Sequence, residues 1–237
     1  LDLRRPEIQK NLMLRSDVTQ TVRNFYHDLQ FAEVETPVLM RSTPEGARDY
    51  LVPSRVNPGR FYALPQSPQT YKQLLMVSGM DRYFQIVKCF RDEDLRADRQ
   101  PEFTQIDVEL SFVNEEMIYH IHEQLMAEIW RKHLGVEVQT PFPRMPYEDA
   151  IRTYGSDKPD LRFDMPICTL SDLLGDCGFK IFETTVSKGG DIVAITVPGL
   201  GELGRGALDR LTEDAKRETG AAGLIYIKVA EDGHLCS

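Results

Sequence analysis

The sequence predicts an α+β fold, in which helices flank a mainly antiparallel sheet and part of a smaller α/β unit follows. Two segments with helical periodicity, residues 14–30 and 115–134, enclose the central region. Between them, the strand-like runs 82–90 and 103–112 are separated by about a dozen residues. A parallel pair would need a longer crossover that contains a helix, so we expect these two strands to pair antiparallel.

The N-terminal part of the chain predicts a helix followed by short strands. Apolar side chains recur at helical spacing over 14–30, and Ser16 is the expected N-cap of this helix. A strand over 32–36 should stop at Pro37, because proline cannot donate a hydrogen bond to a sheet. Two further strand-like runs follow, at 50–53 and 60–64.

The next two elements carry polar side chains in positions where an ordinary core would not need them. SPQTYKQLLMVSGM predicts a helix with Ser67 as N-cap and Pro68 at the first helical position. In the strand after the loop, one face is apolar and consists of Ile106, Val108, Leu110 and Phe112. The other face is polar and consists of Gln105, Asp107, Glu109 and Ser111. The apolar face should pack on a core, and the pattern leaves open whether the polar face meets water or lines a cleft.

Composition excludes several classes of protein. At 237 residues, with 41% hydrophobic and 27% charged residues, the chain is typical of soluble globular proteins, and we expect it to be cytoplasmic without contact with a membrane. Its four cysteines form no CxxC pair, so neither a zinc site nor a disulfide framework is indicated. The net charge of −9 argues against indiscriminate binding of nucleic acid.

The loop after the first central strand has an unusual charge pattern. Three arginines, at positions 91, 96 and 99, stand among four acidic residues. Arg91 at a strand end suits a phosphate clamp, since its guanidinium can bind two oxygens at once, and Phe103 could stack on a base. The charge pattern alone is equally compatible with a salt-bridged surface hairpin.

Longer motifs decide between these readings. CFRDEDLRADRQPEFTQID resembles motif 2 of class II aminoacyl-tRNA synthetases, and FAEVETP resembles their motif 1, with its terminal proline at Pro37. Over roughly residues 1–163 the chain resembles the bacterial-type aspartyl-tRNA synthetase family. The resemblance implies ATP-dependent activation of L-aspartate to aspartyl-adenylate and transfer to the 3′-end of tRNA(Asp), with tRNA(Asn) left open as a second substrate. It also implies Mg²⁺ and a homodimer formed through residues 14–37.

The resemblance further implies a set of site residues. Arg91 is the catalytic residue that grips the α-phosphate and the substrate carboxylate, and Glu45 belongs to a mobile lid. Lys72 pairs with the side-chain carboxylate of aspartate and Asp107 with its ammonium group. The ATP-binding set is Arg91, Asp92, Glu93, Gln100 and Phe103. The aspartate-binding set is Glu45, Ser67, Gln69, Lys72, Arg91, Gln105 and Asp107, and the expected contacts with the tRNA acceptor end are Arg96 and Arg99. No metal ligand is expected within this chain.

The same resemblance predicts the domain organisation. Residues 1–161 correspond to the catalytic core with motifs 1 and 2, and 162–237 to part of the insertion domain that precedes motif 3. Motif 3 and the anticodon-binding barrel of the family are not found. We therefore expect the chain to be an internal piece of a longer enzyme and to be inactive alone.

A second hypothesis rests on the glycines near the C-terminus. GLGELG at 199–204 matches GxGxxG after a predicted strand and before a predicted helix, which is the fingerprint of a Rossmann-like dinucleotide-binding oxidoreductase. Pro198 stiffens that turn, and a single βαβ unit is half of what a dinucleotide normally needs. A binding module without catalysis is the third alternative.

Overall fold

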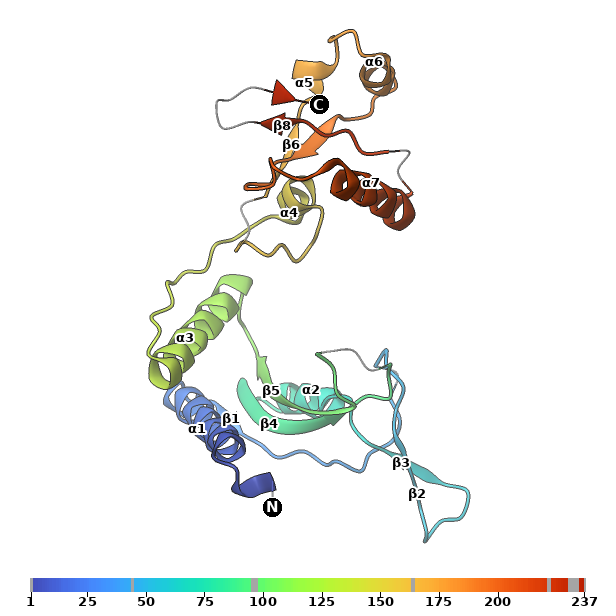
Figure 1. The fold of residues 1–237 in the computed structure, drawn as a ribbon. Helices are drawn as coiled ribbons and strands as arrows, with labels where there is room; N and C mark the ends of the chain where they lie inside the picture. Colours follow the sequence, from blue (N-terminus) through green and yellow to red (C-terminus); the bar gives the residue numbers. More distant parts are fainter. Residues whose placement is uncertain are drawn as a thin grey trace. The chain divides into compact units, whose positions relative to one another are not determined.

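A computed structural model describes residues 2–43, 45–94, 98–162, 165–220, 223–229 and 235–236, and Figure 1 shows its ribbon. The chain divides into two compact units, one up to Phe142 and one from Pro143 onward. The predicted boundary at 161/162 concerns the family's domain architecture, and it stays a prediction.

The first unit opens with a helix that is longer than expected. After a short 3₁₀ turn, Asp2–Arg4, α1 runs over Pro6–Asp28 with Arg5 as its N-cap. The prediction of Ser16 as N-cap is wrong, because Ser16 lies inside the helix. Pro6 fits the first helical position, where its missing N–H is not needed.

The central sheet is mixed, as predicted. Its strands, in spatial order, are β1 (Ala32–Glu33), β4 (Arg82–Phe90) and β5 (Glu102–Leu110). β1 pairs parallel with β4, and β4 pairs antiparallel with β5 along nine residue pairs, with Ile86 opposite Ile106. A separate antiparallel hairpin is formed by β2 (Leu51–Pro53) and β3 (Phe61–Ala63).

Helices lie on both faces of this sheet (Figure 1). On one face, α1 and α3 (Glu115–Leu134) enclose an aromatic core in which the ring of Tyr26 stacks on Phe84 with 5.0 Å between centroids. Val108 and Leu110 of β5 pack against this core. The other face of β5 carries Asp107, which contacts α2 (Gln69–Val77).

The alternation predicted in β5 is confirmed in most positions. Asp107 on the polar face is only 7% exposed, so this face lines a covered site instead of meeting water. On the apolar face, Ile106 stays 41% exposed. Phe112 was expected to point into the core, but it is 94% exposed and has a φ of 59°. The strand has already ended at Leu110, so its period no longer places this side chain.

The ends of α2 and α3 have different causes. α3 begins after Asn114, whose side chain accepts a hydrogen bond from the N–H of Met117, and it ends at Gly135, which has a φ of 65°. For α2, Pro68 takes the N-cap position without a side-chain hydrogen bond. The prediction of Ser67 as N-cap is therefore wrong, because its hydroxyl donates to Glu45 instead.

The second unit is a small α/β assembly. Its helices are α4 (Tyr147–Tyr154), α5 (Ser171–Leu174), α6 (Lys180–Ser187) and α7 (Arg205–Thr219). Its strands form two antiparallel pairs, β6 (Ile167–Thr169) with β7 (Val193–Ile195) and β8 (Lys228–Val229) with β9 (Leu235–Cys236). None of the helices in the described parts of the chain is both long and apolar enough to span a membrane.

This topology does not support the dinucleotide-binding hypothesis. The glycines at 199–204 do connect β7 to α7, and Gly199 has a φ of 78°. However, a Rossmann unit needs its two strands to pair within one parallel sheet. In the described residues, β7 pairs only with β6 and β8 only with β9, in both cases antiparallel. The glycines therefore serve a strand-to-helix turn.

Candidate functional site

The hairpin of β4 and β5 positions the arginine of the predicted phosphate clamp. Arg91 directly follows β4, and its backbone N–H donates to the carbonyl of Pro101 at 2.9 Å, which closes the base of the loop. Its guanidinium lies over the ring of Phe103, 5.2 Å from the centroid. Its Nε is buried and has no hydrogen-bond partner in the described part of the chain. A donor in that state is available for an anionic ligand.

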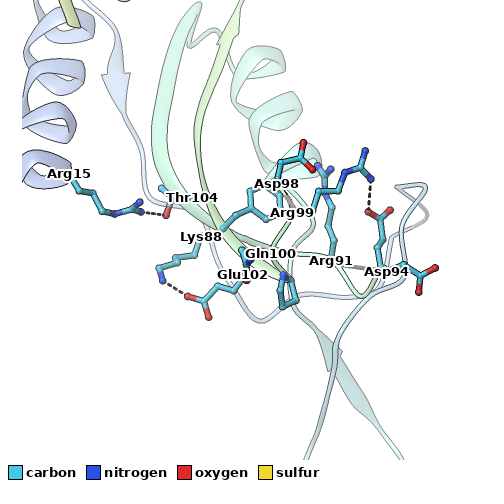
Figure 2. A pocket seen from close by; sticks show the side chains of 12 residues that line it. Arg15, Lys88, Arg91, Asp94, Asp98, Arg99, Gln100, Glu102 and Thr104 are labelled. Carbon is cyan, nitrogen blue, oxygen red and sulfur yellow. Dashed lines mark hydrogen bonds and ion pairs between the residues drawn. The ribbon is translucent and has the colours of Figure 1, made fainter. Parts of the chain in front are cut away.

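A cavity of about 660 Å³ adjoins this arginine (Figure 2). Five residues of the predicted site line it: Arg91, Glu93, Arg99, Gln100 and Phe103. It is also lined by residues that were not predicted to belong to the site: Arg15, Lys88, Asp94, Asp98, Pro101, Glu102 and Thr104. Arg15 comes from α1 and donates to the hydroxyl of Thr104 at 2.6 Å.

The charged loop residues at this cavity form exposed ion pairs. Arg99 lies 3.7 Å from Glu93, and Lys88 pairs with Glu102 across the hairpin. Such exposed pairs contribute at most about 1 kcal/mol, so a phosphate could displace them at small cost. The predicted tRNA contact Arg96 lies outside the described residues.

A buried cation lies on the polar face of β5. Lys72 of α2 places its Nζ 2.9 Å from Oδ1 of Asp107 and 3.2 Å from Oε2 of Glu109. Burial alone would lower the pKa of Lys72, but the hydrogen bonds and charges of the two carboxylates outweigh it and raise the pKa above its usual value. Lys72 therefore stays charged. Oδ2 of Asp107 is buried without a hydrogen-bond partner among the described residues, so it remains available to a ligand donor.

Glu45 is held next to α2 by two hydroxyl groups. Thr43 donates to its Oε1 and Ser67 to its Oε2, each at 3.0 Å. Ser67 therefore connects the start of α2 to Glu45, while Lys72 connects α2 to Asp107 and Glu109. Gln69, in the first turn of α2, lies three residues before Lys72, which places both on the same side of the helix.

Cys89 is a buried thiol whose pKa depends on residues from both halves of the predicted site. This thiol is fully buried in β4, and its Sγ donates to Oε1 of Gln105 at 3.1 Å. Burial is the largest cause that raises its pKa to about 11. Four charged groups also act on it: Asp107 and Glu45 raise the pKa, and Arg91 and Lys72 lower it. The arginine of the phosphate clamp and charged residues of the aspartate set thus all influence the pKa of this thiol.

Several residues of this site were not predicted. Glu109 is the second carboxylate on Lys72, and its place on the polar face, two residues after Asp107, was a usable signal. Gln66 reaches the site through a contact with another loop and Thr43 through a contact within its own loop, and neither leaves a periodic pattern in the sequence. Asp92 was predicted to bind ATP, but it does not line the cavity, and its backbone N–H donates to the carbonyl of Arg48.

The mixed sheet, with an arginine at the mouth of its hairpin and a lysine–carboxylate cluster on its polar face, has the organisation of a class II aminoacyl-tRNA synthetase. The family model described as tRNA synthetases class II (D, K and N) matches residues 1–219. The chain therefore belongs to the class II tRNA synthetase family of the aspartate, lysine and asparagine type.

The relatives with high sequence identity to this chain are aspartate–tRNA ligases. Over 98% of the chain, it is 61% identical to an aspartate–tRNA(Asp/Asn) ligase of Salinibacter ruber. Over its full length, it is 58% identical to an aspartate–tRNA(Asp/Asn) ligase of Symbiobacterium thermophilum and 54% identical to an aspartate–tRNA ligase of Ruminiclostridium cellulolyticum. The chain spans 37% to 40% of the length of these relatives.

Proposed function

We propose that this chain is the ATP- and aspartate-binding part of an aspartate–tRNA ligase. The observation that carries the proposal is a pair of buried groups without hydrogen-bond partners among the described residues: Nε of Arg91, whose guanidinium lies over Phe103, and Oδ2 of Asp107, whose other oxygen contacts Lys72. A substrate with two carboxylates and one ammonium group needs both signs of charge within a few ångströms, and a nucleotide phosphate needs an arginine beside them.

In this proposal, Lys72 selects aspartate. The side-chain carboxylate of the substrate pairs with Lys72 Nζ, and its ammonium donates to the unpartnered Oδ2 of Asp107. Asparagine would offer a neutral amide to a buried cation, which loses a charge-assisted hydrogen bond worth about 1.5–3 kcal/mol. This contrast supports a preference for aspartate.

Arg91 and Phe103 bind the other substrate. The adenine ring of ATP stacks on Phe103, and the Arg91 guanidinium donates to the α-phosphate and to the reacting carboxylate. A carboxylate oxygen of aspartate attacks the α-phosphorus, the bond to the β-phosphate breaks, and pyrophosphate leaves. A ribose hydroxyl at the tRNA 3′-end then attacks the aspartyl carbonyl carbon, AMP leaves with the bonding electron pair, and the hydroxyl proton passes to the phosphate of AMP. The side chains act by positioning and charge neutralisation, without a covalent intermediate on the protein.

Magnesium is assigned to the nucleotide in this proposal. In the described residues, no group of three or more side chains that could bind a metal comes together. Mg²⁺ is commonly held by substrate phosphates and one or two carboxylates, and there it would neutralise phosphate charge. The steps above use only residues of this chain.

The partners of the whole enzyme belong to the same proposal. We assign Arg99, together with Arg96, to the acceptor end of tRNA(Asp) or tRNA(Asn), in the cytoplasm. We assign a homodimer contact to residues 14–37 and their flanks, where exposed apolar side chains support it: Leu12, Met13, Leu14, Val38 and Leu39. Light scattering of the full-length protein should give the mass of a dimer at micromolar concentration, and a monomer would contradict this contact.

An amino-acid panel tests the proposed activity. The full-length protein should catalyse ATP–pyrophosphate exchange with aspartate and at least about a hundredfold less with asparagine or glutamate. Lysine is the matched control within the family, because its cationic side chain would face Lys72. Exchange that is equal with all four amino acids, or absent with aspartate, would contradict the proposal.

A further inference from the structure

A glutamine outside the predicted site is built into it by three hydrogen bonds. Gln66 is only 3% exposed, and its Nε2 donates to the carbonyl of Ala47 at 2.9 Å and to Oδ1 of Asp49 at 2.5 Å. Its Oε1 accepts from the N–H of Ala47 at 3.1 Å. The amide therefore pairs with both polar atoms of one backbone residue, as a neighbouring strand would.

The residue held in this way is next to the Glu45 segment. Ala47 lies two residues after Glu45, and Gly46 between them has a φ of 94°. Asp49, the other partner of Gln66, also accepts a hydrogen bond from Ser42 at 2.5 Å. Gln66 therefore contacts the segment on the C-terminal side of Glu45, and Asp49 connects that contact to the N-terminal side.

We propose that Gln66 is a positioning residue for aspartate binding, which acts through Ala47 to place the carboxylate of Glu45 against Ser67. The inference rests on the proposed function. Gln66 itself touches neither Lys72 nor Asp107 in the structure's hydrogen bonds. A buried amide costs free energy unless it is fully hydrogen-bonded. The hydrogen bonds to the segment that Gln66 holds compensate this cost.

Among the described residues, backbone–backbone hydrogen bonds hold the neighbours of Ala47 but not Ala47 itself. The carbonyl of Arg48 accepts from the N–H of Asp92 at 3.0 Å, and the carbonyl of Tyr50 accepts from Leu64 at 2.9 Å. These bonds would survive truncation of Gln66. Only the backbone before Arg48 would lose its anchor, so the effect should concentrate on Glu45 and on the substrate that it faces.

Truncation of Gln66 in the full-length protein tests this inference. Gln66→Ala should raise the KM for aspartate in pyrophosphate exchange by roughly tenfold, the scale of one or two lost hydrogen bonds, and change the KM for ATP less than twofold. Trypsin should also cleave faster after the exposed Arg48. Glu123→Ala is the matched control, because Glu123 is buried and accepts from the backbone of Phe142. It should leave both KM values unchanged.

A charge swap separates positioning from loss of packing. Gln66→Glu keeps the shape of the side chain but sets a carboxylate against the carboxylate of Asp49, so it should raise the KM for aspartate at least as much as Gln66→Ala. Adding Asp49→Asn restores a donor–acceptor pair. The KM for aspartate of the double variant should therefore be at least about threefold lower than that of Gln66→Glu alone. This is roughly half of a tenfold effect on a logarithmic scale.

The outcomes distinguish the inference from the function on which it rests. If the wild type shows no aspartate-dependent exchange, the proposed function fails. If the wild type is active and Gln66→Ala keeps the KM for aspartate within twofold, the positioning role fails alone. An equal rise in Glu123→Ala, or no recovery in the double variant, would also overturn it.

Discussion

In the proposed function, Lys72 is the residue on which selectivity for aspartate depends. It is a cation whose side chain is only 12% exposed and which two carboxylates already compensate, so a third carboxylate can join only where it takes over one of these contacts. Removing the cation would leave Asp107 and Glu109 facing each other without compensation. Breaking one side of such a buried pair commonly costs about 3–5 kcal/mol.

Substitution of Lys72 should therefore affect aspartate and ATP unequally. In the full-length protein, Lys72→Met should raise the KM for aspartate by at least about a hundredfold, because both the charge and the geometry of its neighbours are lost. Lys72→Arg, which keeps the charge, should have a smaller effect. Steady-state exchange kinetics would refute this role if Lys72→Met changed the KM values for aspartate and ATP by the same factor.

A second prediction at the residue scale concerns the reactivity of the Cys89 thiol. With its pKa raised to about 11, roughly a thousandth of this thiol is ionised at pH 8, and the thiolate is the reactive form. Cys168 and Cys177 are exposed. Mass spectrometry after brief treatment with iodoacetamide at pH 8 should find both modified and Cys89 intact. Early labelling of Cys89 in folded protein would contradict its burial at the centre of the site.

The elements show which parts of the site a sequence can predict. Period-two alternation in β5 correctly separated the core-facing Val108 from Asp107, which contacts Lys72 on the other face, because a strand places alternate side chains on opposite faces. It failed at Phe112, beyond the end of the strand. The roles of Arg91 and Lys72 come from motif likeness and stay predictions. Gln66 contacts another loop and Thr43 contacts Glu45 within its own loop, and no periodic pattern encodes either contact.

Helix ends were the least predictable feature. Ser16 and Ser67 have the right residue type for N-caps, yet α1 begins earlier at Pro6 and Ser67 donates to Glu45. A capping residue is a local preference, and a tertiary partner or a better start nearby overrides it. By contrast, the predicted span of α3 is confirmed at both ends, where Asn114 and Gly135 supply the caps.

The core between α1, α3 and the sheet holds the hairpin in place. Leu125 of α3 is 1% exposed within this core, so Leu125→Ala should lower the free energy of unfolding by about 2–5 kcal/mol. Leu134→Ala is the control on the same helix, since Leu134 is 58% exposed and should change it by less than about 0.5 kcal/mol. Denaturant unfolding that gave equal effects would contradict the assignment of this core.

At the scale of the whole molecule, the chain consists of two compact units, and the family match covers residues 1–219. The site described above is built entirely from the first unit. In the proposed function this site has an ATP side and an aspartate side, and Arg91 belongs to both. The central claim is that these sides form one continuous site for the mixed anhydride of aspartate and AMP.

Binding of a non-hydrolysable aspartyl-adenylate analogue to the full-length protein tests this claim most directly. Calorimetry should find the analogue bound at least about a hundredfold more tightly than aspartate or AMP alone, because one ligand then fills both sides. Arg91→Ala should remove at least about tenfold of that affinity, the worth of one charge-assisted contact. An analogue that binds no better than AMP, or with equal affinity to the wild type and Arg91→Ala, would contradict the account.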